Sequence, residues 1–409
     1  MARRGSRRRH SAREWSWRIA LSLLIIAVGY FSIARTLSQA LRTGDIERAH
    51  HLAPGDGQVG AGFAYSLITA DAGPVNMALA TQAAQVALRQ DPTAIAALST
   101  LGIVAQNKGN PGAARRLFKY AEILSRRDLQ VQLWAIEDSV RRNNIAGALI
   151  HYDIALRTSR NAWALLVPVL GSAIANPPVR AALTQTLSEY PVWGPHFINY
   201  VVGEGEDLPA VAHLLTDMHR AQLTVSPTAQ TALINKLLMS GLTNEAWSYY
   251  SLVNTGTDRR RSRDPNFRGS SESPSLFDWT PSADADIATN FGSFEKGKGL
   301  EFSLPSGTGG QILRQMQLLP LGRYRLEGRS AAINQVERSR PYWVLACQDG
   351  RELGRVILPN SSAAESVFGG EFQVPTTCPV QTLSLVARPS DAVAGVSGEI
   401  YQALLHPVR

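Results

Sequence analysis

Paired arginines are the first residues in this chain whose type and spacing suggest chemistry. Guanidinium groups bind carboxylates and other anions through paired N–H donors. One interpretation of the pairs is a cationic groove for an acidic polymer or for the carboxylates of a protein partner. The alternative is a solvated helix surface whose cations lie near C-terminal helix dipoles. The pairs are Arg115-Arg116, Arg126-Arg127 and Arg141-Arg142.

Metal and cofactor sites are weakly indicated. The histidine pairs of the chain have spacings unsuited to shared metal coordination. Asp284 and Asp286, with Glu295 further along, offer the oxygen ligands that calcium prefers, although a polar turn is the favoured interpretation. The sequence therefore predicts no cofactor and no metal, with a structural calcium as the less favoured alternative.

Catalytic signatures are not found in the sequence. There is no nucleophile elbow, phosphate-binding loop, zinc-ligand spacing or convincing carboxylate pair. We therefore expect a protein that binds and does not catalyse. A glycan-active enzyme stays open as an alternative, because glycosidases can use two carboxylates without any local motif.

The N-terminus has the pattern of a membrane anchor. Residues 1–18 form a basic tail, and an uncharged run extends from Ile19 to Ala34 within a predicted transmembrane helix at 19–37. Sixteen residues of helix span about 24 Å, slightly less than the ~30 Å hydrocarbon core. Arg18 and Arg35 can extend to the headgroups, and Trp15 and Trp17 suit the interface.

The positive-inside rule places the tail in the cytoplasm and the rest of the chain in the periplasm of a Gram-negative cell. We expect a single-pass protein of the inner membrane. The rival interpretation is a cleaved signal peptide, since Ser38-Gln39-Ala40 is an acceptable small-x-small site.

The charge distribution argues against nucleic acid as a partner. The net charge is +8, but residues 1–40 carry eight Arg against Glu14. Residues 41–257 balance at sixteen basic and sixteen acidic side chains. The basic isoelectric point therefore reflects the tail and not a basic body.

The elements that must position these residues begin with a helical repeat. Ala114, Phe118 and Ala121 recur 34 residues later as Ala148, Tyr152 and Ala155. A small residue, a ring and a small residue at offsets of 4 and 7 lie on one helical face. This period and pattern resemble the tetratricopeptide repeat family, which implies a solenoid of helix pairs that binds a partner. We predict this solenoid at 41–253, with repeats at 60–92, 93–126 and 127–160.

The last third of the chain changes period. Residues 254–275 are rich in Arg, Ser, Gly and Pro and are predicted to form a flexible, basic linker. From 276 to 409 apolar residues alternate in short runs, as at Leu300, Phe302 and Leu304. About nine such strands predict an antiparallel β-sandwich. The expected fold class is thus multidomain α+β: a transmembrane helix, an all-α solenoid and a sandwich of jelly-roll type.

Two cysteines, Cys347 and Cys378, both fall in this β-domain. In an oxidising periplasm, two cysteines in one small sandwich are expected to form a disulfide. Two separately buried thiols are the alternative. A catalytic cysteine is disfavoured, because the sequence suggests no histidine on a matching element.

A segment of the β-domain resembles jelly-roll carbohydrate-binding modules. It runs from Gln315 to Leu326, where a strand ends in a Pro/Gly turn and a Tyr-x-Leu strand follows. The resemblance implies glycan binding through aromatic stacking and polar side chains. Large aromatic residues in a sandwich can equally belong to its core. The candidate platform residues are Trp279, Tyr342, Trp343 and Phe368.

An anchor, helical repeats and such a sandwich together resemble accessory proteins of bacterial exopolysaccharide assembly and export. The leading hypothesis is an inner-membrane-anchored scaffold that binds a protein partner through its repeats and a glycan or second protein through its sandwich. The alternative is a cell-envelope assembly or division factor whose sandwich docks only protein.

Overall fold

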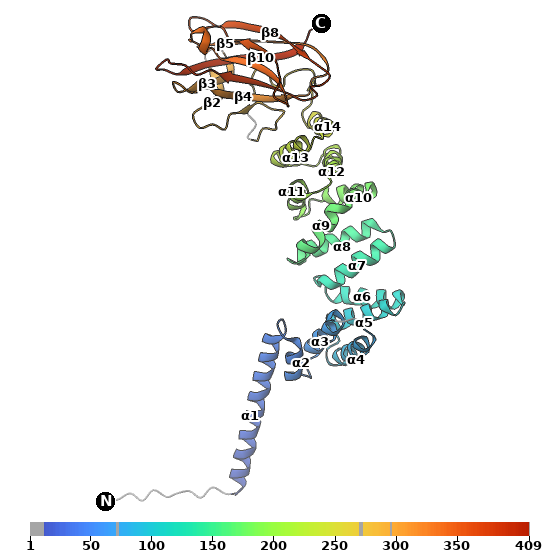
Figure 1. The fold of residues 1–409 in the computed structure, drawn as a ribbon. Helices are drawn as coiled ribbons and strands as arrows, with labels where there is room; N and C mark the ends of the chain where they lie inside the picture. The colour runs from blue at the N-terminus through green and yellow to red at the C-terminus, as the bar shows by residue number, and fades with distance from the viewer. Residues whose placement is uncertain (1–11, 71–72, 270–272, 295–296, 409) are drawn as a thin grey trace, which may run out of the picture. The chain divides into compact units, whose positions relative to one another are not determined.

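The computed structural model describes residues 12–70, 73–269, 273–294 and 297–408, with side chains from residue 15 onward. The chain forms two compact units, Met1–Val167 and Pro168–Arg409. Figure 1 shows the order of the elements along the chain. Most of the predicted basic tail lies outside the described residues.

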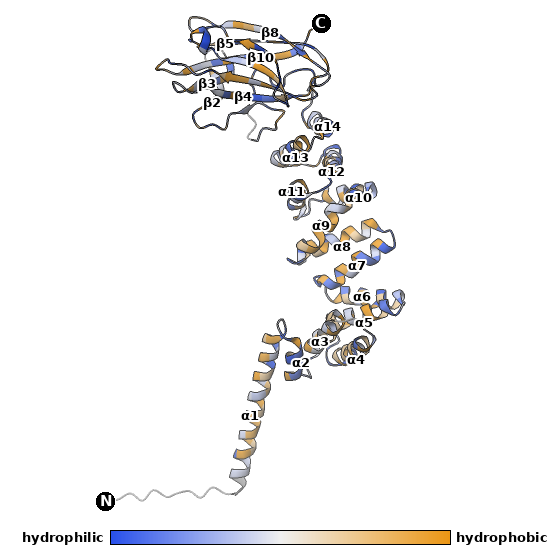
Figure 2. Ribbon diagram, in the orientation of Figure 1, coloured by the Kyte–Doolittle hydropathy of each residue, from blue (hydrophilic) through white to orange (hydrophobic). Residues whose placement is uncertain are grey.

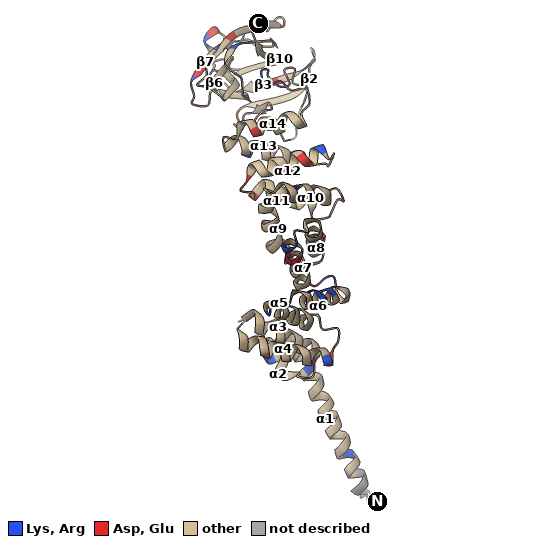
Figure 3. Ribbon diagram, turned by 90° about the vertical axis from the view of Figure 1, so that its right-hand side faces the viewer, with Lys and Arg blue, Asp and Glu red and all other residues tan. Residues whose placement is uncertain are grey.

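The first unit begins with one long apolar helix, α1 (Ala12–Leu41). Its stretch Trp15–Leu41 is long and apolar enough to cross a membrane, a property shared by signal sequences near an N-terminus. Figure 2 shows apolar residues along most of α1, and Figure 3 shows few charged ones. Its apolar side chains are exposed, as Ile26 and Phe31 illustrate, at 67% and 70%. The predicted span at 19–37 lies within this helix.

Helix pairs fill the rest of the first unit. Helices α5 and α7 begin 34 residues apart, as do α6 and α8, so the structure is consistent with the predicted helical repeats. The helices are α2 (Ile46–Leu52), α3 (Gly57–Ala70), α4 (Pro74–Gln90), α5 (Ile95–Asn107), α6 (Pro111–Leu124), α7 (Leu129–Arg141) and α8 (Ile145–Thr158).

Residues 34 positions apart form the turns between the helices and cap the helices that follow. Asn110 and Asn144, 34 residues apart, each accept a hydrogen bond from the backbone N–H three residues later and so cap α6 and α8. The residues before them, Gly109 and Asn143, both have positive φ, at 73° and 56°. Glycine and asparagine adopt this conformation most readily, which explains the tight turn in both repeats.

Close packing of small residues against rings holds the pairs together. Ala114, Phe118 and Ala121 of α6 are buried, as the 34-residue pattern requires. A Cβ atom on Gly102 of α5 would lie 2.5 Å from the Phe118 ring, so only glycine fits there. The same ring stacks on Trp134 of α7 at 4.2 Å between centroids and thereby joins one repeat to the next.

The remaining helices lead into the second unit. Helix α9 (Ala162–Ala173) contains Pro168, where the second unit begins. Proline interrupts the backbone hydrogen bonds of a helix. The others are α10 (Pro177–Leu187), α11 (Gly194–Glu204), α12 (Leu208–Arg220), α13 (Pro227–Met239) and α14 (Thr243–Val253).

The β-domain is an antiparallel sandwich of two five-stranded sheets, as expected from the alternating pattern. Sheet A has the order β1-β4-β9-β6-β7, and sheet B has the order β2-β3-β10-β5-β8. The strands are β1 (Thr280–Pro281), β2 (Ala288–Phe294), β3 (Gly297–Leu304), β4 (Gly310–Gln317), β5 (Gly322–Ala331), β6 (Tyr342–Cys347), β7 (Glu352–Ile357), β8 (Ser366–Val374), β9 (Gln381–Ala387) and β10 (Val396–Pro407).

The prediction of an exposed, flexible linker at 254–275 is wrong for its middle part. Ser262, Arg263 and Phe267 are buried. Ser262 hydrogen-bonds to Ala403 and Leu405 of sheet B, whereas Arg263 bonds to Gln315 and Gln317 of sheet A. The segment therefore contacts both sheets and contributes to their core. Its polar composition misled the prediction, because the charged group is buried with hydrogen-bond partners.

Helices α13 and α14 pack on the start of the sandwich. The Phe277 ring, fully buried, lies 5.0 Å from Tyr250 and 5.4 Å from Trp247 between centroids. The Tyr250 hydroxyl donates to Asp278 at 2.7 Å. We call Trp247, Tyr250, Arg263, Phe277 and Asp278 the helix–sandwich junction.

Candidate functional site

Three of the four aromatic residues predicted as sugar platforms belong to the sandwich core. Trp343, Phe368 and Trp279 are only 0%, 4% and 6% exposed. Trp279 and Trp343 contact each other at 5.6 Å, and the Trp279 indole N–H donates to the carbonyl of Asp264. A buried ring cannot stack on a sugar, so these three assignments are wrong. The space between two facing sheets needs large apolar side chains, and these rings supply them.

Tyr342 is the fourth candidate, and it lies on the outer face of sheet A. Along β6, Trp343 and Leu345 face the core, so Tyr342 and Val344 point outward. Tyr342 pairs with Val386 of β9 and with Ile357 of β7. The ring is half-buried and reachable from this face.

Two arginines already contact this ring. The guanidinium carbons of Arg355 and Arg388 each lie 4.8 Å from the Tyr342 ring centroid, which is cation–π distance. Glu352 accepts two 2.6 Å hydrogen bonds from Arg355 and fixes its orientation. Tyr342 therefore positions cations and does not offer a free aromatic platform.

Strand register brings a third arginine onto the same face. Arg314 of β4 pairs with Ser384 of β9, Ser384 pairs with Val344 of β6, and Val344 pairs with Arg355 of β7. Cross-strand partners share a face, so these four residues form one row across sheet A. Three inter-strand spacings separate Arg314 from Arg355, which is about 14 Å.

Polar groups complete this surface. The Ser384 hydroxyl donates to the Gln311 side-chain oxygen at 3.3 Å. Within the described part of the chain, neither Arg314 nor Arg388 has a carboxylate in salt-bridge distance. We call the following residues the sheet A outer patch: Gln311, Arg314, Tyr342, Glu352, Arg355, Ser384 and Arg388.

The outer face of sheet B has the opposite character. Arg323 and Arg325 of β5 both pair with Glu371 of β8, and Arg329 pairs with Glu365 at 3.0 Å. Its arginines are thus neutralised by carboxylates on the same sheet. Sheet A differs in Arg314 and Arg388, for which no carboxylate partner is found among the described residues, whereas its Arg355 is paired with Glu352.

The helical arginines predicted as a partner groove are partly used inside the fold. Arg115 of α6, Arg141 at the end of α7 and the following C-cap residue Arg142 converge on the buried carboxylate of Asp138, at 3.1, 3.8 and 3.0 Å. Burial by itself would raise the pKa of Asp138, but the hydrogen bonds and charge of Arg115, with the charges of Arg142 and Arg141, hold it below its usual value.

For these three arginines, the interpretation as a free cationic groove is wrong, because they neutralise a buried acid. The other three stay candidates for contact with a partner. Arg116, Arg126 and Arg127 are exposed, and no ion pair of theirs is found among the described residues.

An apolar pocket of about 200 Å³ lies among the helices of the second unit. Leu187, Pro191, Ile198, Met218 and Val225 contribute to its wall. At its edge Tyr190 is 72% exposed, and the nearby Val192 is 82% exposed. Exposed apolar side chains beside a pocket are typical of surfaces that contact other proteins.

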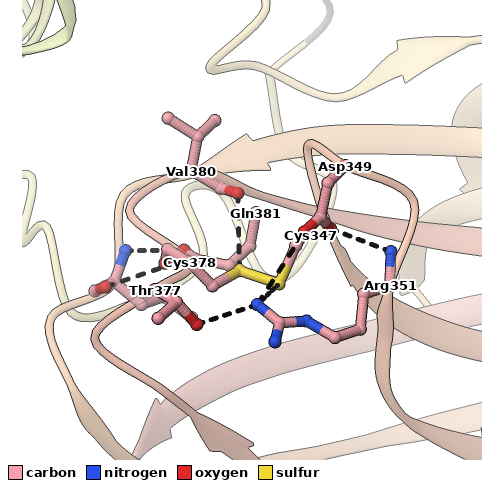
Figure 4. The surroundings of a disulfide bond; sticks show 8 residues. Cys347, Asp349, Arg351, Thr377, Cys378, Val380 and Gln381 are labelled. Atoms are coloured by element: carbon pink, nitrogen blue, oxygen red, sulfur yellow. Dashed lines mark hydrogen bonds and ion pairs between the residues drawn. A yellow bond between two sulfur atoms is a disulfide. The ribbon is translucent and has the colours of Figure 1, made fainter.

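Cys347 and Cys378 form a disulfide at the end of β6 (Figure 4). The Arg351 guanidinium lies beside it and donates to the Thr377 hydroxyl at 2.9 Å. Both cysteines are nearly inaccessible, at 6% and 2% exposure. The bond links the β6 end to the segment before β9, and both strands carry the outer patch.

Asp284 and Asp286 lie in a turn before β2, where the Asp286 N–H donates to the Asp284 carboxylate. Glu295, the third candidate calcium ligand, lies outside the described residues. In the described ranges, no group of three or more His, Cys, Asp or Glu side chains is arranged to hold a metal ion.

The outer patch was missed at the sequence level, although its arginines alternate with core residues in their strands. Arg314 follows Leu313, and Arg355 precedes Val356. Strand alternation predicts that each faces outward. Only the sheet order, which makes β9 and β6 the strands between β4 and β7, brings them together.

No protein-family model and no curated protein matches the chain. Solved structures with similar folds match the C-terminal sandwich. One is the CBM22-1 xylan-binding domain from Paenibacillus barcinonensis Xyn10C, 8% identical, covering 35% of this chain and 92% of that domain, with a TM-score of 0.26. Another is TmCBM61 in complex with β-1,4-galactotriose, at 16% identity, 36% and 97% coverage and a TM-score of 0.26.

A third is the enzymatically active domain of tailspike protein 4 of bacteriophage CBA120, at 11% identity and a TM-score of 0.26. The match covers 32% of this chain but only 20% of the tailspike chain. Similarities this low assign neither a family nor a function to the chain.

Proposed function

We propose that this protein is a membrane-anchored scaffold whose sandwich binds a glycan on the outer face of sheet A. The observation that carries the proposal is the outer patch itself. It gathers amide and guanidinium donors on one sheet, and two of its arginines, Arg314 and Arg388, have no carboxylate partner among the described residues, whereas the arginines of the opposite face are already paired. Sugars are recognised by such convergent polar groups.

The proposed location is the inner membrane, with the N-terminus in the cytoplasm and the bulk of the chain in the periplasm. Six arginines precede the apolar stretch of α1, which favours retention of the tail inside. The disulfide between Cys347 and Cys378 supports an oxidising location for the sandwich.

The proposed role is assembly or export of an exopolysaccharide, without catalysis. In this role the anchor keeps the chain beside the membrane machinery, the helical repeats hold a protein partner, and the sandwich holds the polymer. Support for a protein partner comes from the apolar pocket with Tyr190 at its edge and from the exposed Arg116, Arg126 and Arg127, which form no ion pair with the described residues.

The test is retention of the detergent-solubilised full-length chain on a panel of immobilised bacterial polysaccharides, neutral and acidic, at low salt. We expect retention on at least one polysaccharide and release by the same polysaccharide in solution. If no polysaccharide on the panel retains the protein, the glycan function is wrong. The alternative of a cell-envelope assembly or division factor with a protein-docking sandwich would then replace it.

A further inference from the structure

The recognition chemistry of the outer patch is ionic and not aromatic. Neutral glycans are commonly held by stacking of a sugar on a free aromatic ring face. Among the four aromatic candidates, three are buried in the core and the fourth contacts two guanidinium groups. A sugar that stacked on Tyr342 would have to displace Arg355 or Arg388 from it.

The same contacts make the patch suitable for carboxylates. The ring of Tyr342 limits the motion of Arg355 and Arg388, so less side-chain entropy is lost when an anion binds. Arg314 and Arg388 bring charges that no carboxylate of the described chain neutralises. Charge-assisted hydrogen bonds to carboxylates are stronger than bonds between neutral groups.

The arrangement favours an extended polymer over a folded acidic protein. Arg314 and Arg355 lie about 14 Å apart across four strands, with Ser384 and Val344 between them in the same row. Stable protein interfaces need an apolar centre. At the centre of this row, Val344 and Ser384 are 8% and 6% exposed and offer little contact area.

We propose that the ligand of the outer patch is an acidic polysaccharide that carries carboxylates along its chain, bound by Arg314, Arg355 and Arg388. This inference rests on the proposed glycan function and names the class of glycan. The polymer crosses sheet A from β4 to β7, with its carboxylates on the guanidinium groups and its hydroxyls on the side-chain amide of Gln311.

The test measures binding of the full-length chain, in detergent, to three soluble polymers: polygalacturonate, neutral dextran and poly-L-glutamate. The variants are Arg314→Gln, Arg388→Gln and Glu352→Gln. Arg329→Gln on sheet B is the matched control, because it removes the same charge from an arginine that Glu365 already pairs. Every variant keeps the basic N-terminal tail, so binding by the tail is constant.

We expect polygalacturonate to bind tightest and to bind more weakly as salt is raised. Arg314→Gln and Arg388→Gln should each weaken it by about tenfold, and Arg329→Gln by less than about twofold. Glu352→Gln should strengthen it by a few-fold, because Arg355 then loses its internal competitor. A gain of binding cannot result from misfolding, so this variant separates recognition from stability.

The outcomes distinguish failure of the acidic-ligand inference from failure of the proposed glycan function. Equal binding of dextran and polygalacturonate, unchanged in the arginine variants, overturns the acidic-ligand inference and leaves glycan binding intact. Poly-L-glutamate binding as tightly as polygalacturonate overturns it in favour of an acidic protein. Failure to bind any polysaccharide in the wider panel overturns the proposed function together with the inference.

Discussion

At the scale of single residues, each arginine is defined by what lies against its guanidinium group. Arg115 on α6 and Arg314 on β4 are both exposed arginines in the sequence pattern, yet the first neutralises a buried carboxylate, whereas no carboxylate of the described residues lies within salt-bridge distance of the second. An arginine that neutralises a buried carboxylate stabilises the fold, whereas an exposed arginine without such a partner can bind a ligand. Among the described residues, Arg116, Arg126 and Arg127 of the helical part and Arg314 and Arg388 of the sandwich have no carboxylate partner.

Asp138 gives a stability prediction at this scale. Replacement by Asn removes the charge on which Arg115, Arg141 and Arg142 converge. We expect Asp138→Asn to lower the free energy of unfolding of the first unit by about 2 kcal/mol. The control is Glu137→Gln, an exposed neighbour that pairs with Arg141 alone, for which less than about 0.5 kcal/mol is expected. Equal losses in urea denaturation would contradict the convergence argument.

The same carboxylate predicts a pH dependence. Because its folded-state pKa is lowered, the folded protein binds fewer protons at this site than the unfolded chain does. Its contribution to stability is complete above about pH 5 and falls as the pH drops through the folded-state value. Thermal unfolding between pH 3 and pH 7 should therefore show a smaller acid loss in Asp138→Asn than in the parent chain. Parallel acid profiles would contradict this assignment.

At the scale of elements, the sequence predicted what periodicity can reveal. The 34-residue recurrence of Ala114 and Phe118 located helix pairs, and the alternation at Leu300, Phe302 and Leu304 located a strand. It did not reveal which strands are neighbours, on which the outer patch depends. It also misjudged residues 254–275, since a polar composition cannot show that Arg263 is buried.

Arg263 makes the packing of this segment testable. Its side chain donates to the carbonyl of Phe277 at 2.9 Å and to the Gln317 side chain at 2.7 Å, and it also bonds to the carbonyl of Met316. Burial lowers its pKa to about 10, against the opposing charge of Asp278, so it stays protonated at neutral pH.

Replacement of Arg263 by Met leaves these acceptors buried without a donor. We expect the second unit to lose about 3 kcal/mol or more of unfolding free energy. Arg261→Met is the matched control, because that arginine is exposed and lies 3.8 Å from Asp258. A flexible linker at this position would instead give two variants of equal stability in chemical denaturation followed by tryptophan fluorescence.

The disulfide links the end of β6 to the segment before β9, and both of these strands carry residues of the outer patch. It joins residues 31 apart and restricts the unfolded chain, which corresponds to about 3–4 kcal/mol in the entropic description. We expect a reducing agent to lower the melting temperature of the parent chain. The double variant Cys347→Ala, Cys378→Ala should melt at the lower temperature with or without reductant. If full reduction leaves the melting temperature of the parent chain unchanged, the disulfide has no stabilising role.

At the scale of the whole molecule, the chain combines one apolar N-terminal helix, a set of helix pairs and a β-sandwich. The apolar α1, the repeats and the sandwich could all be located from the sequence. The side of the membrane on which the sandwich lies is an inference from the basic tail. This side of the membrane determines whether the sandwich can meet a polysaccharide outside the cytoplasm.

The topology can be tested with reporters placed after Arg409. We expect alkaline phosphatase, which needs an oxidising compartment, to be active in intact cells, and a reporter that works only in the cytoplasm to be silent. A fusion that omits residues 1–41 is the control and should reverse both signals. Activity of the cytoplasmic reporter alone on the full chain would contradict the proposed location.

The most direct test of the central claim is arginine footprinting of the full-length protein. The chain is treated with phenylglyoxal with and without polygalacturonate, and the modification of each arginine is read by mass spectrometry. The account predicts that the polymer protects Arg314, Arg355 and Arg388 and leaves Arg323, Arg325 and Arg329 of sheet B unchanged. Protection of the sheet B arginines, or of none of the six, would contradict glycan binding on the outer face of sheet A.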